Sequence, residues 1–492
     1  MSERERESRR ERLARLRAAG IDPYPARVGP REPIAAVRGR HDGHDAAWLE
    51  AHPERVAVAG RILAVRTFGK LLFFSLVENG ASLQASARAK EMDPAVFDFA
   101  RSLDVGDFVR VEGPVWRTRT GELTLDVRGL DLLAKSLRPL PEKWHGLADV
   151  ELRFRRRYLD LLVNEDARRI ALVRSRTVAA LRAALDARGF IEVETPVLQP
   201  LYGGASARPF ATHHALYDQK LYLRISDELY LKRLVVGGLD RVYEMAHNFR
   251  NEGVSKKHNP EFTMMECYQA YADYRDMMEL VQALLRETAE RVHGTTRIEY
   301  RGEKIDLGLP WPRVSLCDAV AEATGVDVLA APDLGSLREA VRGRGLDPGD
   351  APTWATLVDA LFSAHVEPRL VQPTLIVDYP RELSPLAKRS LADARLAERF
   401  EAFVAGMEIG NAFSELNDPD DQRERLLEQA QAHARGDEEA HPLDEDYLLA
   451  LEYGLPPTGG LGVGVDRVVM LLTDAPHIRE VLLFPHLRPE GD

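Results

Sequence analysis

The sequence predicts an antiparallel α+β domain that follows a small β-rich domain. Residues 55–136 contain short β-rich segments separated by turn residues such as "ENG" and "RTG". After residue 150, helical and strand-like stretches alternate, but the strands come in adjacent groups without a regular βαβ rhythm. Of the 492 residues, 45% are hydrophobic and 29% are charged, which is typical of a globular chain with more than one domain.

Residues 1–54 are predicted to form an N-terminal helix and a linker. The helix is expected over 4–18, because Leu13 and Leu16 are spaced for one face and Gly20 is a stop signal. The stretch "IDPYPARVGPREP" that follows is rich in Pro and Gly and is typical of a linker.

Residues 55–136 are predicted to form a five-stranded β-barrel of the OB-fold kind. Five short strands in about eighty residues fit such a barrel. The strands are expected at 55–66, 71–78, 81–87, 107–117 and 122–128.

The remaining chain divides into a linker, 137–150, and a large antiparallel α+β domain, 151–492. Helices are expected at 165–188 and 274–292, and a mostly helical insertion at about 313–372. Strands are expected at 190–194, 221–225, 241–249 and 262–268.

Composition excludes several classes of protein. The net charge of −12 argues against a general nucleic-acid coat protein but leaves a nucleic-acid partner possible through local charge. No apolar run approaches the roughly 20 residues that span a bilayer, and the charged N-terminus lacks a signal-peptide core. Two cysteines exclude a disulfide framework and a Cys-based zinc site. We therefore expect a cytoplasmic protein without a membrane partner.

The stretch "NFRNEGVSKKHNPEFTMMECY" (248–268) reads as a β-hairpin with unusual side chains. Strand side chains alternate, so Phe262, Met264, Glu266 and Tyr268 share one face of the second strand, and Arg250 follows the first. One strand of this kind is explained by an edge strand that exposes its Glu to solvent.

A second strand repeats the composition of the first. In "GMEIGNAFSELND", Asn411, Phe413 and Glu415 share a face. Two strands that each present a carboxylate beside aromatic rings favour a pocket for an ammonium group.

The glycine-rich stretch "GGLGVGVDRVVML" (459–471) does not match G-x-G-x-x-G, and the chain has no P-loop. It reads as a buried strand that runs into a helix. Arg467 at the junction is well placed to hold polyphosphate, although it could equally pair with a core carboxylate.

Together these motifs resemble the class II aminoacyl-tRNA synthetases, and within them the lysyl-tRNA synthetases. The resemblance begins at residue 55 and covers nearly all of the chain from there. It rests on "GFIEVETPVL", "GGASARPF", "YLRISDELYLKRLVVGG", "RVYEMAHNFRNEG", "HNPEFTMME", "AYADY", "LPPTGGLG" and "GLGVGVDRVVML", in that family's order and with its connecting phrases. The first signature, which ends at Pro196, forms a dimer interface in the family, so a homodimer is implied.

The resemblance implies that ATP and L-lysine form lysyl-adenylate, and that the lysyl group then passes to the 3′ end of tRNA(Lys). It assigns Arg250 to the α-phosphate and Arg467 to the γ-phosphate end as the catalytic residues. The ATP-binding residues implied are Arg250, Glu252, His258, Asn259, Phe262, Glu401 and Arg467. Glu401 and Glu408 match the family's Mg²⁺ carboxylates, and hard oxygen ligands suit that ion.

The same matching gives the lysine pocket. Glu228 and the backbone near Gly204 are implied to meet the α-ammonium, and Glu415 with Tyr268 the ε-ammonium. The full set is Gly204, Glu228, Glu266, Tyr268, Asn411, Phe413 and Glu415. An acidic pocket disfavours an apolar competitor, which would leave buried carboxylates unpaired.

The β-barrel is similar to the family's anticodon-binding domain, in which Phe73, Gln84 and Glu122 match base-contacting positions. Two departures stand out. Ser86 occupies a position that usually carries an aromatic residue two after the Gln, and "RISDELY" replaces a more usual Ala-Pro before Glu228.

Two alternative functions are also compatible with parts of the sequence. An enzyme that uses the adenylate to modify a protein or another amine would share the fold, but relatives of that type lack the OB domain. A non-catalytic tRNA-binding protein would be expected to lose Arg250, Arg467 or the metal carboxylates, and none is lost.

Overall fold

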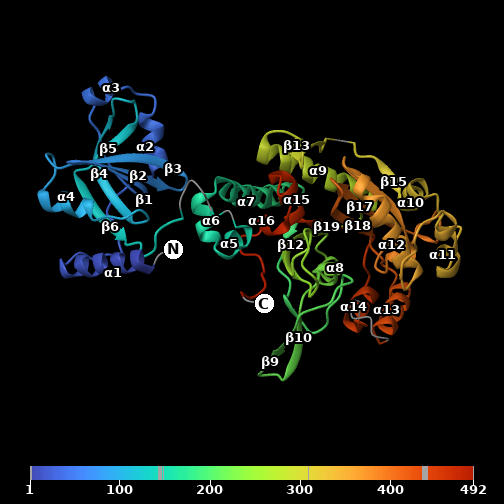
Figure 1. Ribbon diagram of the computed structural model, residues 1–492. Helices are drawn as coiled ribbons and strands as arrows, with labels where there is room; N and C mark the ends of the chain where they lie inside the picture. Colours follow the sequence, from blue (N-terminus) through green and yellow to red (C-terminus); the bar gives the residue numbers. More distant parts are fainter. Residues whose placement is uncertain (1–2, 142–146, 148, 309, 435–441, 491–492) are drawn as a thin grey trace. The chain divides into compact units, whose positions relative to one another are not determined.

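The computed structural model describes residues 3–141, 147, 149–308, 310–434 and 442–490 (Figure 1). The chain divides into two compact units, Met1–Gly146 and Leu147–Asp492. Residues 142–146 and 148, within the expected linker 137–150, lie outside the described residues.

The first unit is built on a ring of paired strands. Its strands are β1 Arg55–Phe68, β2 Leu71–Glu78, β3 Ala81–Arg88, β4 Phe108–Arg117, β5 Leu123–Asp126 and β6 Gly129–Ala134. The order is β1-β2-β3-β5-β4, and β4 pairs back with β1, which closes the ring. Alternate side chains such as Leu72, Phe74 and Leu76 fill its interior. All five expected strands are present, and β6 adds a sixth on β4.

Four helices accompany the ring: α1 Glu3–Ala18, α2 Ile34–His41, α3 Ala46–Ala51 and α4 Pro94–Arg101. The helix expected over 4–18 is α1. The sequence reading missed α2 and α3, whose apolar residues Ile34, Val37 and Leu49 join the barrel core. These helices are short, so the apolar period that identifies longer helices has little room to show.

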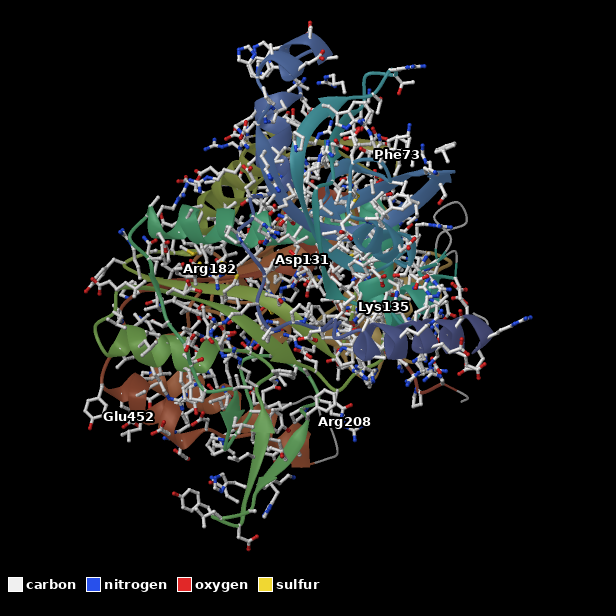
Figure 2. All side chains as sticks on the ribbon, turned by 90° about the vertical axis from the view of Figure 1, so that its left-hand side faces the viewer. Phe73, Asp131, Lys135, Arg182, Arg208 and Glu452 are labelled. Atoms are coloured by element: carbon white, nitrogen blue, oxygen red, sulfur yellow. The ribbon has the colours of Figure 1, made fainter. Side chains whose placement is uncertain are left out.

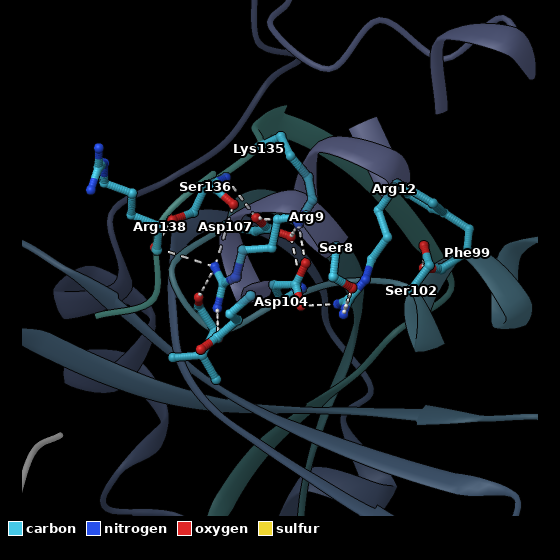
Figure 3. A network of polar contacts seen from close by, with 12 residues as sticks. Ser8, Arg9, Arg12, Phe99, Ser102, Asp104, Asp107, Lys135, Ser136 and Arg138 are labelled. Carbon is cyan, nitrogen blue, oxygen red and sulfur yellow. Dashed lines mark hydrogen bonds and ion pairs between the residues drawn. The ribbon is translucent and has the colours of Figure 1, made fainter. Parts of the chain in front are cut away.

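Polar contacts attach α1 to the barrel, as the close-up in Figure 3 shows. Arg9 donates to the carbonyl oxygens of Val105, Ser136 and Arg138, and Arg12 pairs with Asp104. Beneath them the Nζ of the fully buried Lys135 lies 2.7 Å from Asp107 and 2.5 Å from Asp104. These contacts hold α1 against the barrel, although the helix has few apolar residues to bury there.

Lys135→Met is expected to destabilise the first unit by about 3–5 kcal/mol, because it leaves a buried carboxylate without its cation. Hydrogen exchange of the full chain, followed in β6 and α1 peptides, measures the loss of protection. The exposed Lys90 supplies the control Lys90→Met. Unchanged protection in Lys135→Met would show that the buried ion pair does not hold this region together.

The second unit contains an eight-stranded sheet. Its order is β15-β16-β17-β18-β19-β12-β11-β7, and only the outer pairs, β15–β16 and β7–β11, are parallel. The strands are β7 Ile191–Glu192, β11 Arg241–Phe249, β12 Glu261–Ala270, β15 Arg313–Ser315, β16 Thr374–Pro380, β17 Leu396–Val404, β18 Met407–Ser414 and β19 Thr458–Gly464. The predicted antiparallel α+β fold is confirmed.

Helices cover one face of this sheet and leave the other for the pocket. Met265 and Cys267 of β12 join one core with α7 Glu165–Asp186, α9 Tyr274–His293 and α15 Val465–Thr473. The opposite side of the strand carries Phe262, Met264, Glu266 and Tyr268. The alternation predicted from the sequence is therefore what separates core from pocket in this strand.

The second unit contains further helices and strands outside this sheet. They are the helices α5 Val150–Arg155, α6 Arg157–Val163, α8 Glu228–Val236, α10 Leu316–Thr324, α11 Leu334–Gly343, α12 Trp354–His365, η1 Glu367–Arg369, η2 Arg381–Leu383, α13 Pro419–Ala434, α14 Glu445–Glu452 and α16 Ile478–Val481, and the strands β8 Leu198–Gln199, β9 Ala211–His214, β10 Gln219–Leu223, β13 Arg297–Tyr300 and β14 Glu303–Asp306. The strand expected at 221–225 is β10, which belongs to a separate three-stranded sheet with β8 and β9. Across the described residues of both units, no helix is long and apolar enough to cross a membrane.

Candidate active site

A cavity of about 540 Å³ lies on the exposed face of the central strands. Its walls come from β12, β18 and β19, from the loop 250–260 that joins β11 to β12, and from the segment around Gly204. The predicted residues that line it are Gly204, Glu228, Arg250, Glu252, His258, Asn259, Phe262, Glu266, Tyr268, Glu401, Glu408, Asn411, Phe413 and Arg467. Strands far apart in the sequence thus bring these side chains to one site.

Arg250 is a cation that lines the cavity beside Phe262. Its guanidinium lies 5.1 Å from the centre of the Phe262 ring, and its Nε donates to the carbonyl of Ile225 at 3.4 Å. Burial lowers the pKa of Arg250 from its ordinary value. Among the described residues it forms no ion pair, so its charge is available to an anion.

Arg467 and His258 form a second polar group beside it. Arg467 donates to the Glu408 carbonyl at 2.7 Å and to its carboxylate at 3.0 Å, and it lies 3.2 Å from His258 Nε2. Burial and the nearby Arg467 lower the pKa of His258, which favours the neutral ring. The sequence offered two interpretations of Arg467, a phosphate-binding residue and the partner of a carboxylate. The structure agrees in part with each, because Arg467 lines the cavity and also pairs with Glu408.

Glu401 and Glu408 lie on the paired strands β17 and β18. Burial, and then the negative charge of Glu408, raise the pKa of Glu401 to about 7. Burial alone would raise the pKa of Glu408, but Arg467 holds it below its usual value. Arg399, which the sequence reading missed, donates to Glu401 at 2.6 Å and to Asn411 at 3.1 Å. The only signal for Arg399 was its position two residues before Glu401, on the same face of a strand.

The acidic end of the cavity contains Glu228, Glu266 and Tyr268. The Tyr268 hydroxyl donates to Glu266 at 3.3 Å, and the Ser226 hydroxyl donates to the same carboxylate at 3.1 Å. Gly204 has φ of +86°, and a Cβ there would lie 2.8 Å from Ser226 Oγ. A glycine at this position lets the backbone approach the acidic end closely.

Glu415 lies just behind the cavity wall and pairs with a buried cation of the protein itself. Its partner is Lys232 of α8, which is fully buried and also donates to Glu228 at 2.6 Å. A side chain at Gly460 would meet Glu415 Oε1 at 2.0 Å, so glycine is required there. Burial alone would lower the pKa of Lys232, but Glu228 and Glu415 hold it well above its usual value.

Lys232 was missed by the sequence reading. Glu228 and Lys232 are spaced i,i+4 on a helix, a pattern that usually marks a solvent-exposed pair. Burial of both residues could not be read from that spacing. The ammonium also lies 5.5 Å from the Phe413 ring and 6.0 Å from the Tyr447 ring.

Asp227, one of the residues in place of the more usual Ala-Pro, adds a further buried carboxyl group. It accepts a hydrogen bond from Asn248 Nδ2 at 3.1 Å and lies within hydrogen-bonding reach of Glu266. Burial raises its pKa to about 6. Burial and the charge of Asp227 in turn raise the pKa of Glu266 well above its usual value.

Asp227→Asn is expected to stabilise the chain at pH 8 and to change little at pH 4. The folded-state pKa is raised, so ionising Asp227 between the unfolded value of about 3.9 and the folded value costs stability that stays lost above pH 6. The gain at pH 8 is on the order of 2–3 kcal/mol.

Urea unfolding of Asp227→Asn at both pH values measures this difference. Asp218→Asn, at an exposed position, is the control. An equal effect of Asp227→Asn at pH 4 and pH 8 would contradict the account.

The predicted base-contacting residues are dispersed over the outer side of the barrel. Phe73 projects outward from β2 (Figure 2), and Gln84 donates to Thr124 Oγ1 of β5 at 2.9 Å. Glu122 is exposed in the turn before β5. These residues belong to the first unit, whereas the predicted catalytic residues belong to the second.

The segment around Pro196 is exposed. Ile191, Val197, Leu198 and Leu201 expose between 38% and 52% of their surface in this region. Thr195 donates through its backbone N–H and its hydroxyl to Glu244, at 3.0 and 2.7 Å, which fixes the segment against β11.

Comparisons with known proteins agree with this geometry. Residues 149–488 match the family described as tRNA synthetases class II (D, K and N), and residues 56–133 match the OB-fold nucleic acid binding domain. The lysine–tRNA ligase of Chloroflexus aurantiacus is 54% identical over 483 residues, which cover 98% of this chain and 97% of that protein. The lysine–tRNA ligase of Moorella thermoacetica is 50% identical over 484 residues, 98% of each chain.

Proposed function

Because the chain belongs to the class II tRNA synthetases, and among them to the lysine–tRNA ligases, we propose that its cavity joins L-lysine to ATP in the following way. The lysine carboxylate attacks the α-phosphorus of ATP, a P–O bond to the lysyl group forms, and pyrophosphate leaves with the electrons of the broken bond. The terminal ribose hydroxyl of tRNA(Lys) then takes the lysyl group and AMP leaves. The observation that carries the proposal is one cavity lined both by clustered carboxylates and by Arg250, a cation without an ion-pair partner among the described residues.

Arg250 holds the α-phosphate and the negative charge that develops on it. A positioned cation in a partly buried site stabilises such charge more than it would in water. The half-buried Phe262 ring provides a stacking surface for adenine, with Glu252, His258 and Asn259 around the nucleotide. Arg467 holds the γ-phosphate end.

Glu401 and Glu408 fit a Mg²⁺ site. Burial, and then the negative charge of Glu408, raise the pKa of Glu401, and a divalent cation held by the two carboxylates would relieve their repulsion. An ion held by two carboxylates would complete its shell with phosphate oxygens and water. When bound, Mg²⁺ would neutralise phosphate charge, while Arg399 keeps Glu401 in place.

At the acidic end, charge selects the amino acid. Asp227, Glu228, Glu266 and Glu415 are four buried carboxyl groups, and the resident ammonium that pairs with Glu228 and Glu415 is that of Lys232, so acidic groups outnumber this cation. Lysine brings two ammonium groups. Glu228 and the backbone near Gly204 meet the α-ammonium, and Glu415 with Tyr268 and Glu266 meets the ε-ammonium, above the lining of Asn411 and Phe413.

Pyrophosphate exchange into ATP tests this function. The purified chain is assayed with lysine, aspartate and asparagine in turn. Exchange that depends on lysine supports the proposal. Exchange with aspartate or asparagine and not with lysine would overturn the assignment of the acidic end, and no exchange with any of them would favour a non-catalytic tRNA-binding protein.

We also propose a homodimer through the Pro196 segment and a cytoplasmic location. The exposed apolar side chains around Pro196 support the first, because a second copy would cover them. Sedimentation equilibrium of the purified chain tests it. Both cysteines, Cys267 and Cys317, are buried and unpaired, which is in line with a reducing compartment.

A further inference from the structure

The outer side of the barrel carries a further aromatic side chain, that of Trp116, which is not among the predicted base-contacting residues. Trp116 of β4 is half-buried and points away from the core, since the preceding Val115 and its register partner Leu125 are interior residues. Its register partner is Thr124 of β5, which in turn pairs with Gln84 of β3. Trp116 therefore belongs to the same row of outward side chains as one of the predicted base-contacting residues.

The indole of Trp116 leans across β5 towards Ser86. Its Nε1–H donates to Ser86 Oγ at 3.3 Å. Ser86 is the register partner of Phe73 on β2. The Ser86 side chain is small and wholly covered, so the place where an aromatic residue would stand on β3 is filled from β4 instead.

A cation backs the indole. The guanidinium of Arg88 lies 4.3 Å from the centre of the Trp116 ring, and Arg88 also pairs with Glu91 at 3.1 Å. About a third of the Arg88 side chain, 32%, is exposed. An indole stacked with a guanidinium offers both a flat surface for a nucleobase and a positive charge near its phosphate.

These contacts place two aromatic side chains on either side of Ser86. Phe73 lies on one side, with the 64% exposed Phe68 set edge-on to it at 6.2 Å, and Trp116 with Arg88 lies on the other. Neighbouring rings on an OB-fold face can stack successive bases of a single-stranded segment.

We propose that Trp116, stacked with Arg88, forms a second base-stacking site for the tRNA anticodon and replaces the aromatic residue that Ser86 lacks. The inference rests on the proposed function, since the ligand is the tRNA of that reaction. It goes further in naming a contact from a different strand. A phenylalanine or tyrosine at 86 and the indole of Trp116 would compete for the same space.

Substitution tests the site by comparing two activities of the full chain. Trp116→Ala is expected to lower kcat/KM for aminoacylation of tRNA(Lys) by about 10–100-fold relative to lysine-dependent pyrophosphate exchange, as loss of one stacked base predicts. The double variant Trp116→Ala/Ser86→Tyr restores an aromatic ring at the same place and is expected to recover most of the loss. The control is Trp48→Ala, which removes a 37% exposed tryptophan from α3 on the same unit.

Cross-linking of the unaltered chain gives an independent result that does not depend on how the variant folds. Transcripts carrying 5-iodouridine in the anticodon are irradiated with the protein and the cross-linked tryptic peptides are identified. A cross-link in the peptide that spans residues 111–117, where Trp116 is the aromatic residue, supports the site.

The two failures are distinguishable. If the unaltered chain does not attach lysine to tRNA, the proposed function itself fails. If it does, but Trp116→Ala changes aminoacylation no more than exchange, or cross-links occur at Phe73 and never in 111–117, Trp116 fills space beside Ser86 and contacts no base.

Discussion

Arg250→Ala is expected to lower kcat of lysine-dependent pyrophosphate exchange by about a thousandfold, as removal of one preorganised charge-stabilising group does in other enzymes. The guanidinium lies in the cavity without an ion-pair partner among the described residues, so its charge is free for the α-phosphate. The stabilisation is needed most when negative charge builds up in the transition state. We therefore expect kcat to fall far more than the affinity for lysine. Exchange kinetics with ATP and lysine varied separately measure both.

Two further variants show whether the loss of rate comes from the guanidinium of Arg250 itself. Arg250→Lys keeps a positive charge but loses the planar fork, so it is expected to recover only part of the rate. Arg241→Ala removes an exposed arginine from the far end of β11, the strand that precedes Arg250, and is expected to leave the rate unchanged. A loss in Arg250→Ala that appears only in the KM for ATP would assign Arg250 to ground-state binding instead of catalysis.

Glu415→Gln is expected to raise the KM for lysine by about 100-fold or more and to leave the KM for ATP nearly unchanged. The substitution keeps the shape of the side chain and removes the negative charge, and loss of one partner of a buried charge pair costs about 2–5 kcal/mol. It also leaves Lys232 with Glu228 alone, so the resident ammonium would repel the ε-ammonium of the substrate.

The contact with Lys232 makes a further outcome measurable. Lys232→Met, by itself, removes the group that positions Glu228 and Glu415. Combined with Glu415→Gln, it removes an unbalanced buried cation, so the double variant is expected to lose less lysine affinity than the two single losses added together. Glu424→Gln, at an exposed position on α13, is the control. An unchanged KM for lysine in Glu415→Gln would remove Glu415 from the pocket.

The sequence predicted the parts of the site that follow from local rules. Alternation along β12 placed Phe262, Glu266 and Tyr268 on one face, and the structure brings these three into the cavity. The antiparallel character of the sheet followed from the grouping of strands. The resemblance to a family supplied the names of the ligands, which alternation could not give.

The rest depended on contacts between distant segments. Lys232 and Glu415 are 183 positions apart, and the packing of α8 against β11 and β12 is what brings them together. From the sequence, Ser86 indicated that β3 lacks an aromatic residue that contacts a base. In the structure the indole of Trp116, which reaches Ser86, comes from β4. Patterns within one strand or helix do not reveal which other element lies over it.

We expect the buried carboxylates at the acidic end to select an amino acid with two ammonium groups. Norleucine, which has a methyl group where lysine has its ε-ammonium, tests it most directly. We predict that kcat/KM for pyrophosphate exchange is lower with norleucine than with lysine by about 10⁴-fold or more, because the buried carboxylates would be left unpaired. A difference of about tenfold or less would mean that the cavity recognises the aliphatic chain alone, and would contradict the account.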